Sequence, residues 1–188
     1  MHLSPCENKP MTFEEAIAGT GAPSSLIEHL CLIAVPYVSF DNRLHEGQLV
    51  VHKDIQRDIA DLFGLMAAWE FPIGRIVPIV RYGWSDDASM ADNNTSAFNY
   101  RFIAGTARLS AHALGLAVDI NPLVNPVVYA DGRVSPLKAC YEPGGKGVLT
   151  AESPVVQEFL RRGWRWGGLF ESFKDYHHFE FANNRVLQ

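Results

Sequence analysis

The longest regular pattern of hydrophobic positions in the chain lies between residues 53 and 70. Its apolar positions, spaced three and four residues apart, are Ile55, Ile59, Leu62, Phe63, Met66 and Trp69. Charged residues such as Asp54, Arg57 and Asp61 fill the positions between them. The pattern predicts an amphipathic helix, and its apolar stripe is more typical of a core-facing surface than of a cofactor site.

Three shorter helices are predicted from the residues that begin them. The segment 12–15 has the form of a capping box and starts a short helix. One of the two serines at 24–25 can cap a second. The pair Ser153-Pro154 places a capping residue before a proline in the first turn, which predicts a helix to about Arg162.

Runs rich in β-branched, aliphatic and aromatic residues predict the strands. These runs cover residues 32–40, 48–52, 76–80, 116–120 and 177–181, with a further extended segment at 98–104. The polar stretch 86–96 predicts a long loop. Several Pro and Gly residues in 121–147 predict mostly irregular structure, with a turn at 130–132.

Helices and strands therefore follow one another without regular strand–helix–strand units. This order predicts an α+β fold, with an antiparallel sheet that carries helices mainly on one face and the active site on the other. The chain of 188 residues has no repeat, low-complexity tract or linker-like stretch. We therefore expect a single domain over 1–188.

Composition and charge narrow the classes of function. The chain has 47% hydrophobic and 20% charged residues, as ordinary globular proteins do. Its net charge of -5 argues against a nucleic-acid partner, which a basic surface would bind. The longest apolar runs, such as 30–38, are too short to cross a bilayer. No secretory signal is visible, and the compartment and oligomeric state stay open.

Two segments far apart in the sequence carry the residue types of a catalytic zinc site. His112 and Asp119 lie in one of them, and His178 lies in the other. Small residues and a glycine between His112 and Asp119 suit a chain that passes from a loop into a strand. A catalytic zinc ion uses three protein ligands and keeps a fourth position for water. The three residues thus predict a site for one Zn²⁺ ion and metal-assisted hydrolysis.

The strand predicted at 177–181 separates its side chains between two faces. His178 and Glu180 project to one face, and Phe179 and Phe181 project to the other, where they join the core. His177 is expected to point away from His178 and not to be a ligand. Glu180 can orient the imidazole of His178 by a hydrogen bond, or it can serve in a structural salt bridge.

Hydrolysis also needs a base and a group that stabilises the developing oxyanion. Asp175, three residues before His178, is the candidate base, and Glu171 is the reserve candidate. Arg101 is the candidate for stabilising the oxyanion, with Arg81 as the alternative.

These motifs resemble those of a known enzyme family. Ser-x-His-x-x-Gly-x-Ala-x-Asp at 110–119, followed by Asp-x-x-His-Phe-Glu at 175–180, is similar to the zinc D-alanyl-D-alanine carboxypeptidases. That group includes the vancomycin-resistance-type D,D-peptidases and the L-alanyl-D-glutamate endolysins. Supporting matches are Ser89-Met90, Asn93 to Arg101, Asn121-Pro122, Asn125-Pro126 and Trp164-x-Trp166-Gly167-Gly168. The resemblance covers about 75–181, and 1–74 form the N-terminal part of the expected domain.

The resemblance implies a role for each matched residue. His112, Asp119 and His178 are implied as the zinc ligands, and Asp175 takes the position of the general base, where many relatives carry Glu. Arg101 matches an arginine that steadies the substrate carbonyl.

Further implications concern substrate and fold. Ser110 matches a serine that contacts the substrate, and the implied fold is the small α+β domain shared with the hedgehog signalling domain. The implied function is a zinc metallopeptidase that hydrolyses peptidoglycan stem peptides at a bond involving a D-amino acid, as a carboxypeptidase or an endopeptidase. Such a substrate implies action in the periplasm, the cell wall or outside the cell.

The alternative is a catalytically silent zinc domain that binds cell-wall peptide or a protein partner, and a third possibility is a domain whose histidines are structural.

Overall fold

The computed structural model describes residues 9–103 and 105–181. Its α-helices are α1 (Phe13–Ala16), α2 (Ser24–Ile27), α3 (Gln56–Ala68), α4 (Asp86–Ala91) and α5 (Pro154–Arg161). Its strands are β1 (Leu30–Val38), β2 (Leu44–His52), β3 (Arg75–Ile76), β4 (Asn94–Thr95), β5 (Ala117–Asp119), β6 (Val127–Tyr129), β7 (Val134–Ser135), β8 (Trp164–Trp166), β9 (Phe173–Asp175) and β10 (His178–Phe181). Short 3₁₀ helices are η2 (Lys53–Ile55), η3 (Ile79–Tyr82), η4 (Ala111–Leu114) and η5 (Gly167–Leu169).

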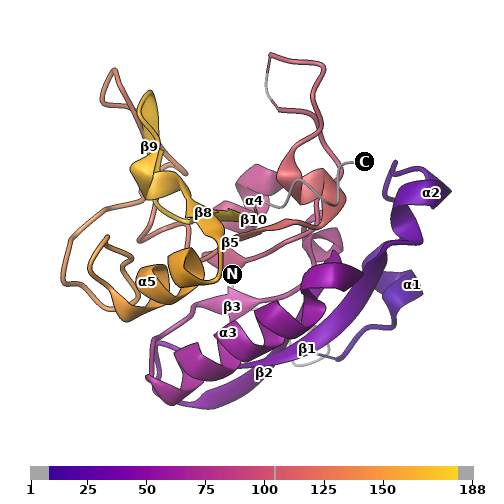
Figure 1. The fold of residues 1–188 in the computed structure, drawn as a ribbon, viewed down its shortest axis with the longest axis horizontal. Helices are drawn as coiled ribbons and strands as arrows, with labels where there is room; N and C mark the ends of the chain where they lie inside the picture. The colour runs from indigo at the N-terminus through magenta and orange to yellow at the C-terminus, as the bar shows by residue number, and fades with distance from the viewer. Residues whose placement is uncertain (1–8, 104, 182–188) are drawn as a thin grey trace.

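The N-terminal part is built on a long hairpin of β1 and β2 with α3 lying along it (Figure 1). Val35 of β1 and Val51 of β2 belong to the same hydrophobic cluster as Ile59 and Phe63 of α3. The helix predicted at 53–70 is confirmed, although its first turn is the 3₁₀ helix η2. The capping box that begins α1 is confirmed too, with both reciprocal hydrogen bonds present.

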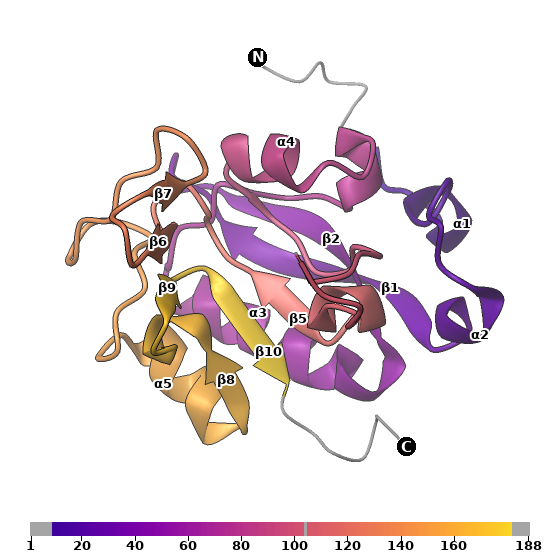
Figure 2. The same ribbon diagram turned by 90° about the horizontal axis from the view of Figure 1, so that it is seen from above.

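The C-terminal part contains a three-stranded antiparallel sheet in the order β5-β10-β8, visible in Figure 2. Phe179 of β10 pairs with Val118 of β5 and with Trp166 of β8. Its side chain is fully buried and stacks on Phe159 of α5, with ring centroids 4.0 Å apart. The predicted helix at about 153–162 and the core position of Phe179 are therefore confirmed.

The remaining strands are short and form two further sheets. One has the order β7-β6-β9, and the other is the parallel pair β3–β4. The mixed architecture confirms the α+β class. The sequence predicted a single antiparallel sheet. The described strands instead form four separate sheets of two or three strands each, and the pair β3–β4 is parallel.

Three of the predicted elements differ from the structure. The strand predicted at 76–80 is only β3, because Pro78 lacks a backbone N–H and begins the 3₁₀ helix η3. The loop predicted at 86–96 contains α4, which Ser85 caps through a hydrogen bond to the main-chain nitrogen of Ala88. The extended segment predicted at 98–104 has an isolated bridge at Phe102 and a main-chain hydrogen bond from Phe98 to Val50, and residue 104 lies outside the described residues. Within the described residues, no helix is both long and apolar enough to cross a membrane.

Candidate metal centre and active site

The 3₁₀ helix η4 places His112 inside the protein. Ser110 caps this helix, and its hydroxyl accepts a hydrogen bond from the main-chain nitrogen of His112 at 3.3 Å. Gly115 ends it with a φ of 68°, and a Cβ there would lie 2.7 Å from the main-chain nitrogen of His52. Only glycine fits both the backbone angle and this close approach. The side chain of His112 is almost fully buried.

The other two candidate ligands face each other across two strands. Asp119 is the last residue of β5, and His178 is the first residue of β10 and its direct antiparallel partner. Side chains of such a pair project to the same face of the sheet, so the register alone brings the carboxylate and the imidazole together. The segment that includes Ser96 bridges Asp119 from its other side.

Three ligand atoms converge at one point of the structure. Nε2 of His112 is 3.1 Å from Nδ1 of His178, and Oδ1 of Asp119 is 3.2 Å from the former and 3.0 Å from the latter. Tetrahedral zinc with ligand bonds of about 2.0–2.1 Å separates its ligand atoms by about 3.3 Å. The three distances therefore fit the edges of a zinc site to within a few tenths of an ångström, and these residues form a possible metal site.

The outer nitrogen of each imidazole is anchored by an acceptor. Nδ1 of His112 donates to the main-chain oxygen of Ala97 at 2.6 Å. Nε2 of His178 lies 3.4 Å from Oε2 of Glu180. In the neutral form that binds a metal ion, with those protons in place, the two imidazoles turn lone pairs toward each other and toward the Asp119 carboxylate. Three electron-rich atoms at this distance repel one another unless a cation lies between them.

The pKa shifts of the site also indicate that a positive charge is needed between the three ligand atoms. Burial by itself raises the pKa of Asp119, but the charges of His112 and His177 hold that pKa well below its usual range. Burial lowers the pKa of His178, yet hydrogen bonds to Asp119 and Glu180 outweigh it and raise the value to about 10. The carboxylate thus stays ionised and calls for positive charge beside it, from a proton or a metal ion.

Glu180 lies where the sequence pattern predicted, on the metal side of β10. Besides its contact with His178, its Oε1 forms an ion pair with Arg165 of β8 at 2.9 Å. The hydrogen bond from His178 lowers the pKa of Glu180. The two contacts are those expected for either role, since one faces an imidazole and the other is a salt bridge.

Asp175, the candidate base, ends β9 close to the metal site. Its side chain is largely buried, and Gly167 packs against its backbone. A Cβ at Gly167 would overlap the main-chain oxygen of Asp175 and lie 2.8 Å from its Cβ, so this close approach needs glycine. Glu171, the reserve candidate, is exposed to solvent. The geometry favours Asp175 over Glu171.

His177 is a part of the site that the sequence pattern missed. The strand begins only at His178, so the alternation of side chains does not extend back to His177. Its ring is buried, and Nε2 lies 3.0 Å from Oδ1 of Asp175. His177 is not one of the three converging ligands. In the sequence, nothing except its residue type indicated that His177 lies in the site.

The candidate substrate-binding residues have other contacts in the structure. Nη2 of Arg101 forms an ion pair with Asp86 at 2.8 Å, and within the described residues its guanidinium has no ion pair with a candidate metal ligand. The hydroxyl of Ser110 is engaged as the cap of η4. Arg81 donates to the main-chain oxygen of Lys9 at 3.2 Å, in a different part of the molecule.

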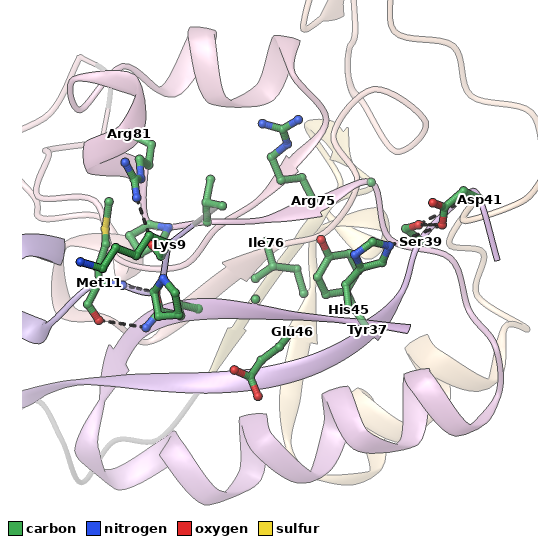
Figure 3. A pocket seen from close by; sticks show the side chains of 16 residues that line it. Lys9, Met11, Tyr37, Ser39, Asp41, His45, Glu46, Arg75, Ile76 and Arg81 are labelled. Carbon is green, nitrogen blue, oxygen red and sulfur yellow. Dashed lines mark hydrogen bonds and ion pairs between the residues drawn. The ribbon is translucent and has the colours of Figure 1, made fainter. Parts of the chain in front are cut away.

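A hollow of about 360 Å³ adjoins Arg81, and none of the three candidate metal ligands lines it. Figure 3 shows it between the segment of Lys9 and Met11 and the ring pair of Tyr37 and His45. Lysine, arginine, aspartate and glutamate all line it, so its charge favours no class of ligand. The candidate chemistry therefore belongs to the buried site and not to this hollow.

One comparison with known proteins gives a match over part of the chain. A family model described as D-alanyl-D-alanine carboxypeptidase matches residues 104–181, about two fifths of the 188 residues. This range contains the three candidate ligands and Asp175. The match confirms the resemblance that the motifs predicted, and it supports a zinc peptidase of this family in general. Neither the curated proteins nor the solved structures gave a match.

Proposed function

We propose that the protein is a zinc metallopeptidase that hydrolyses peptidoglycan stem peptides at a bond involving a D-amino acid. The observation that carries the proposal is the convergence of Nε2 of His112, Oδ1 of Asp119 and Nδ1 of His178, with the outer nitrogens of both imidazoles anchored. The family match over 104–181 supplies the peptidase class and supports the substrate class by analogy.

Each residue of the site has a separate role in the proposed hydrolysis. His112, Asp119 and His178 would hold the zinc ion, which as a Lewis acid lowers the pKa of a water molecule to about 7 and polarises a carbonyl group. Asp175 takes a proton from the attacking water as the new C–O bond forms. It then gives a proton to the leaving amine as the C–N bond breaks. The proposed role of Arg101 is to stabilise the developing oxyanion, which requires its ion pair with Asp86 to open.

The decisive experiment combines metal analysis with digestion of muropeptides. Protein purified without added zinc is expected to contain close to one zinc ion per chain. Mass spectrometry of the digest is expected to show released D-alanine or, for an endopeptidase, two peptide fragments. Zinc without any cleavage would instead favour the silent binding domain. Absence of zinc and of cleavage would overturn the proposal.

A pair of variants tests the base. Asp175→Asn is expected to lower turnover by about 100-fold or more while the zinc content stays the same, because proton transfer contributes about that much. Glu171→Gln, at an exposed position on the same segment, is the matched control and is expected to keep normal turnover. The reverse result would assign the base to Glu171.

A further inference from the structure

His177 lies between two carboxylates of the site. Its Nε2 is 3.0 Å from Oδ1 of Asp175 and 3.9 Å from Oδ2 of Asp119. Oδ1 of Asp119 meanwhile contacts His112 and His178. The imidazole thus connects the candidate base with the opposite oxygen of a candidate metal ligand.

The ring of His177 is fixed by its other nitrogen. Nδ1 donates to the main-chain oxygen of Asn125 at 2.7 Å, since a carbonyl oxygen can only accept. Asn125 is itself fully buried and donates to the main-chain oxygens of Ile120 and Gly147 while it accepts from the nitrogen of Leu149. The imidazole therefore has little freedom to turn, and Nε2 is held toward Asp175.

Asp175 depends on this contact. Its Oδ1 is buried and receives no hydrogen bond of good geometry from any described residue. The group that faces this oxygen is Nε2 of His177 at 3.0 Å, within hydrogen-bond distance but without the angle of a directed hydrogen bond. A buried carboxylate oxygen without a partner is costly, so an N–H group at Nε2 of this imidazole stabilises the carboxylate in this position.

We propose that His177 is a positioning residue that holds the carboxylate of Asp175 in the orientation needed for proton transfer. It acts through Asp175 and contacts neither substrate nor metal. For activity, this inference rests on the proposed role of Asp175 as the base.

Two amide side chains test the two nitrogens of His177 separately. In His177→Asn the amide nitrogen lies near the place of Nδ1, so it can donate to Asn125 but leaves Asp175 without a partner. In His177→Gln the amide nitrogen lies near the place of Nε2, so it can donate to Asp175. If His177 only anchors Asn125, asparagine is the better replacement; if it positions Asp175, glutamine is.

Steady-state kinetics on a muropeptide, with zinc content measured on each variant, separates these cases. His177→Asn is expected to lower kcat about 10–100-fold with little change in KM and no loss of zinc, because a small misplacement of a reacting group costs about that much. The kcat of His177→Gln is expected to be at least about fivefold higher than that of His177→Asn. Equal loss in both variants, or higher activity in His177→Asn, would overturn the proposal.

A second measurement does not depend on activity. Urea unfolding of the chelator-treated wild type, His177→Asn, Asp175→Asn and the double variant forms a double-mutant cycle. Coupling of at least about threefold in the unfolding equilibrium constant is expected for residues in contact. Additive effects would overturn the proposed contact. If the cycle shows coupling between residues 175 and 177 but the wild type cleaves no muropeptide, the proposed function fails while the contact between the two residues stands.

Discussion

At the scale of single residues, the two imidazoles of the site turn different nitrogens toward the shared point. His112 uses Nε2 because its Nδ1 is bound to the main-chain oxygen of Ala97, which precedes it by 15 residues. His178 uses Nδ1 because its Nε2 faces Glu180 on the same strand. The outer contact of each ring thus decides which nitrogen is left for a metal ion.

Glu180 should therefore control the affinity of the site for zinc. Glu180→Ala removes the acceptor that orients His178, and we expect it to weaken zinc binding by about 10–100-fold, as is usual for partners of ligand histidines. Glu180→Gln keeps an acceptor oxygen at the same reach and is expected to lose less. Competition with a chromogenic chelator measures both affinities. Equal affinity in Glu180→Ala and the wild type would show that His178 is oriented by other contacts.

The residues of the site could be predicted from the sequence, whereas the hydrogen bonds and packing that hold them in place could not. His112, Asp119, His178 and Glu180 are recognisable from spacing and strand alternation, which are local properties. The anchoring by Ala97 and the burial of His177 against Asp175 depend on main-chain atoms and on where β10 begins. Sequence spacing does not determine such contacts, because they arise only once distant segments pack together.

At the scale of elements, strong hydrophobic periodicity was a reliable guide and polarity was not. α3 forms where apolar positions recur at helical spacing, whereas α5 was predicted from the pair Ser153-Pro154 at its start; the buried faces of both pack into one cluster. The polar segment at 86–96 nonetheless contains α4, because Ser85 caps it and its acidic first turn suits a helix N-terminus. Local capping therefore made a helix where hydrophobicity indicated a loop.

Arg162, at the C-terminal end of α5, adds a polar link between α5 and α3. Its Nη1 donates to Oδ1 of Asp58 at 2.6 Å, and its Nε donates to Glu158 at 2.7 Å. Trp164 donates to the other oxygen of Asp58 at 2.6 Å. Hydrogen bonds from Arg161 and Arg162 lower the pKa of Glu158 to about 2. Two helices and a strand are thus joined by one charged network.

This network predicts how stability depends on pH. Since folding lowers the pKa of Glu158, its stabilisation is fully present above about pH 4.5 and is lost as the pH falls toward 2. Glu158→Gln is expected to reduce the free energy of unfolding by about 0.5–1 kcal/mol near neutral pH, the range for surface ion pairs. The difference from wild type should shrink below pH 4.5 and vanish near pH 2. Urea denaturation across this pH range measures it, and Glu171→Gln is the exposed control; a difference independent of pH would contradict the assignment.

At the scale of the whole molecule, the motif-bearing part packs against the N-terminal hairpin and helix. Val118 and Phe179, which flank the candidate ligands, belong to the same hydrophobic cluster as Val51 of β2 and Phe63 of α3. The family match begins at residue 104, yet Ala97, which anchors His112, lies before it. The site is therefore supported by a larger part of the chain than the part that carries its motifs.

A bound zinc ion should consequently stabilise the molecule as a whole. It would join η4, β5 and β10, and its ligands His112 and His178 are 66 residues apart. Zinc at about 100 times its dissociation constant adds about 2.7 kcal/mol by mass action. For a chain of this size, about 2–4 °C of melting temperature corresponds to each kcal/mol, so chelation is expected to lower Tm by about 5–10 °C.

Thermal denaturation before and after chelation, and again after zinc is restored, measures this shift. Asp119→Asn is the matched comparison, because it keeps the size of the side chain but removes the ionised oxygen that both imidazoles contact. Its Tm should respond far less to zinc than that of the wild type. A wild-type Tm that is insensitive to both chelator and zinc would mean that the three converging atoms hold a proton rather than a metal ion, since only metal binding makes stability depend on zinc concentration.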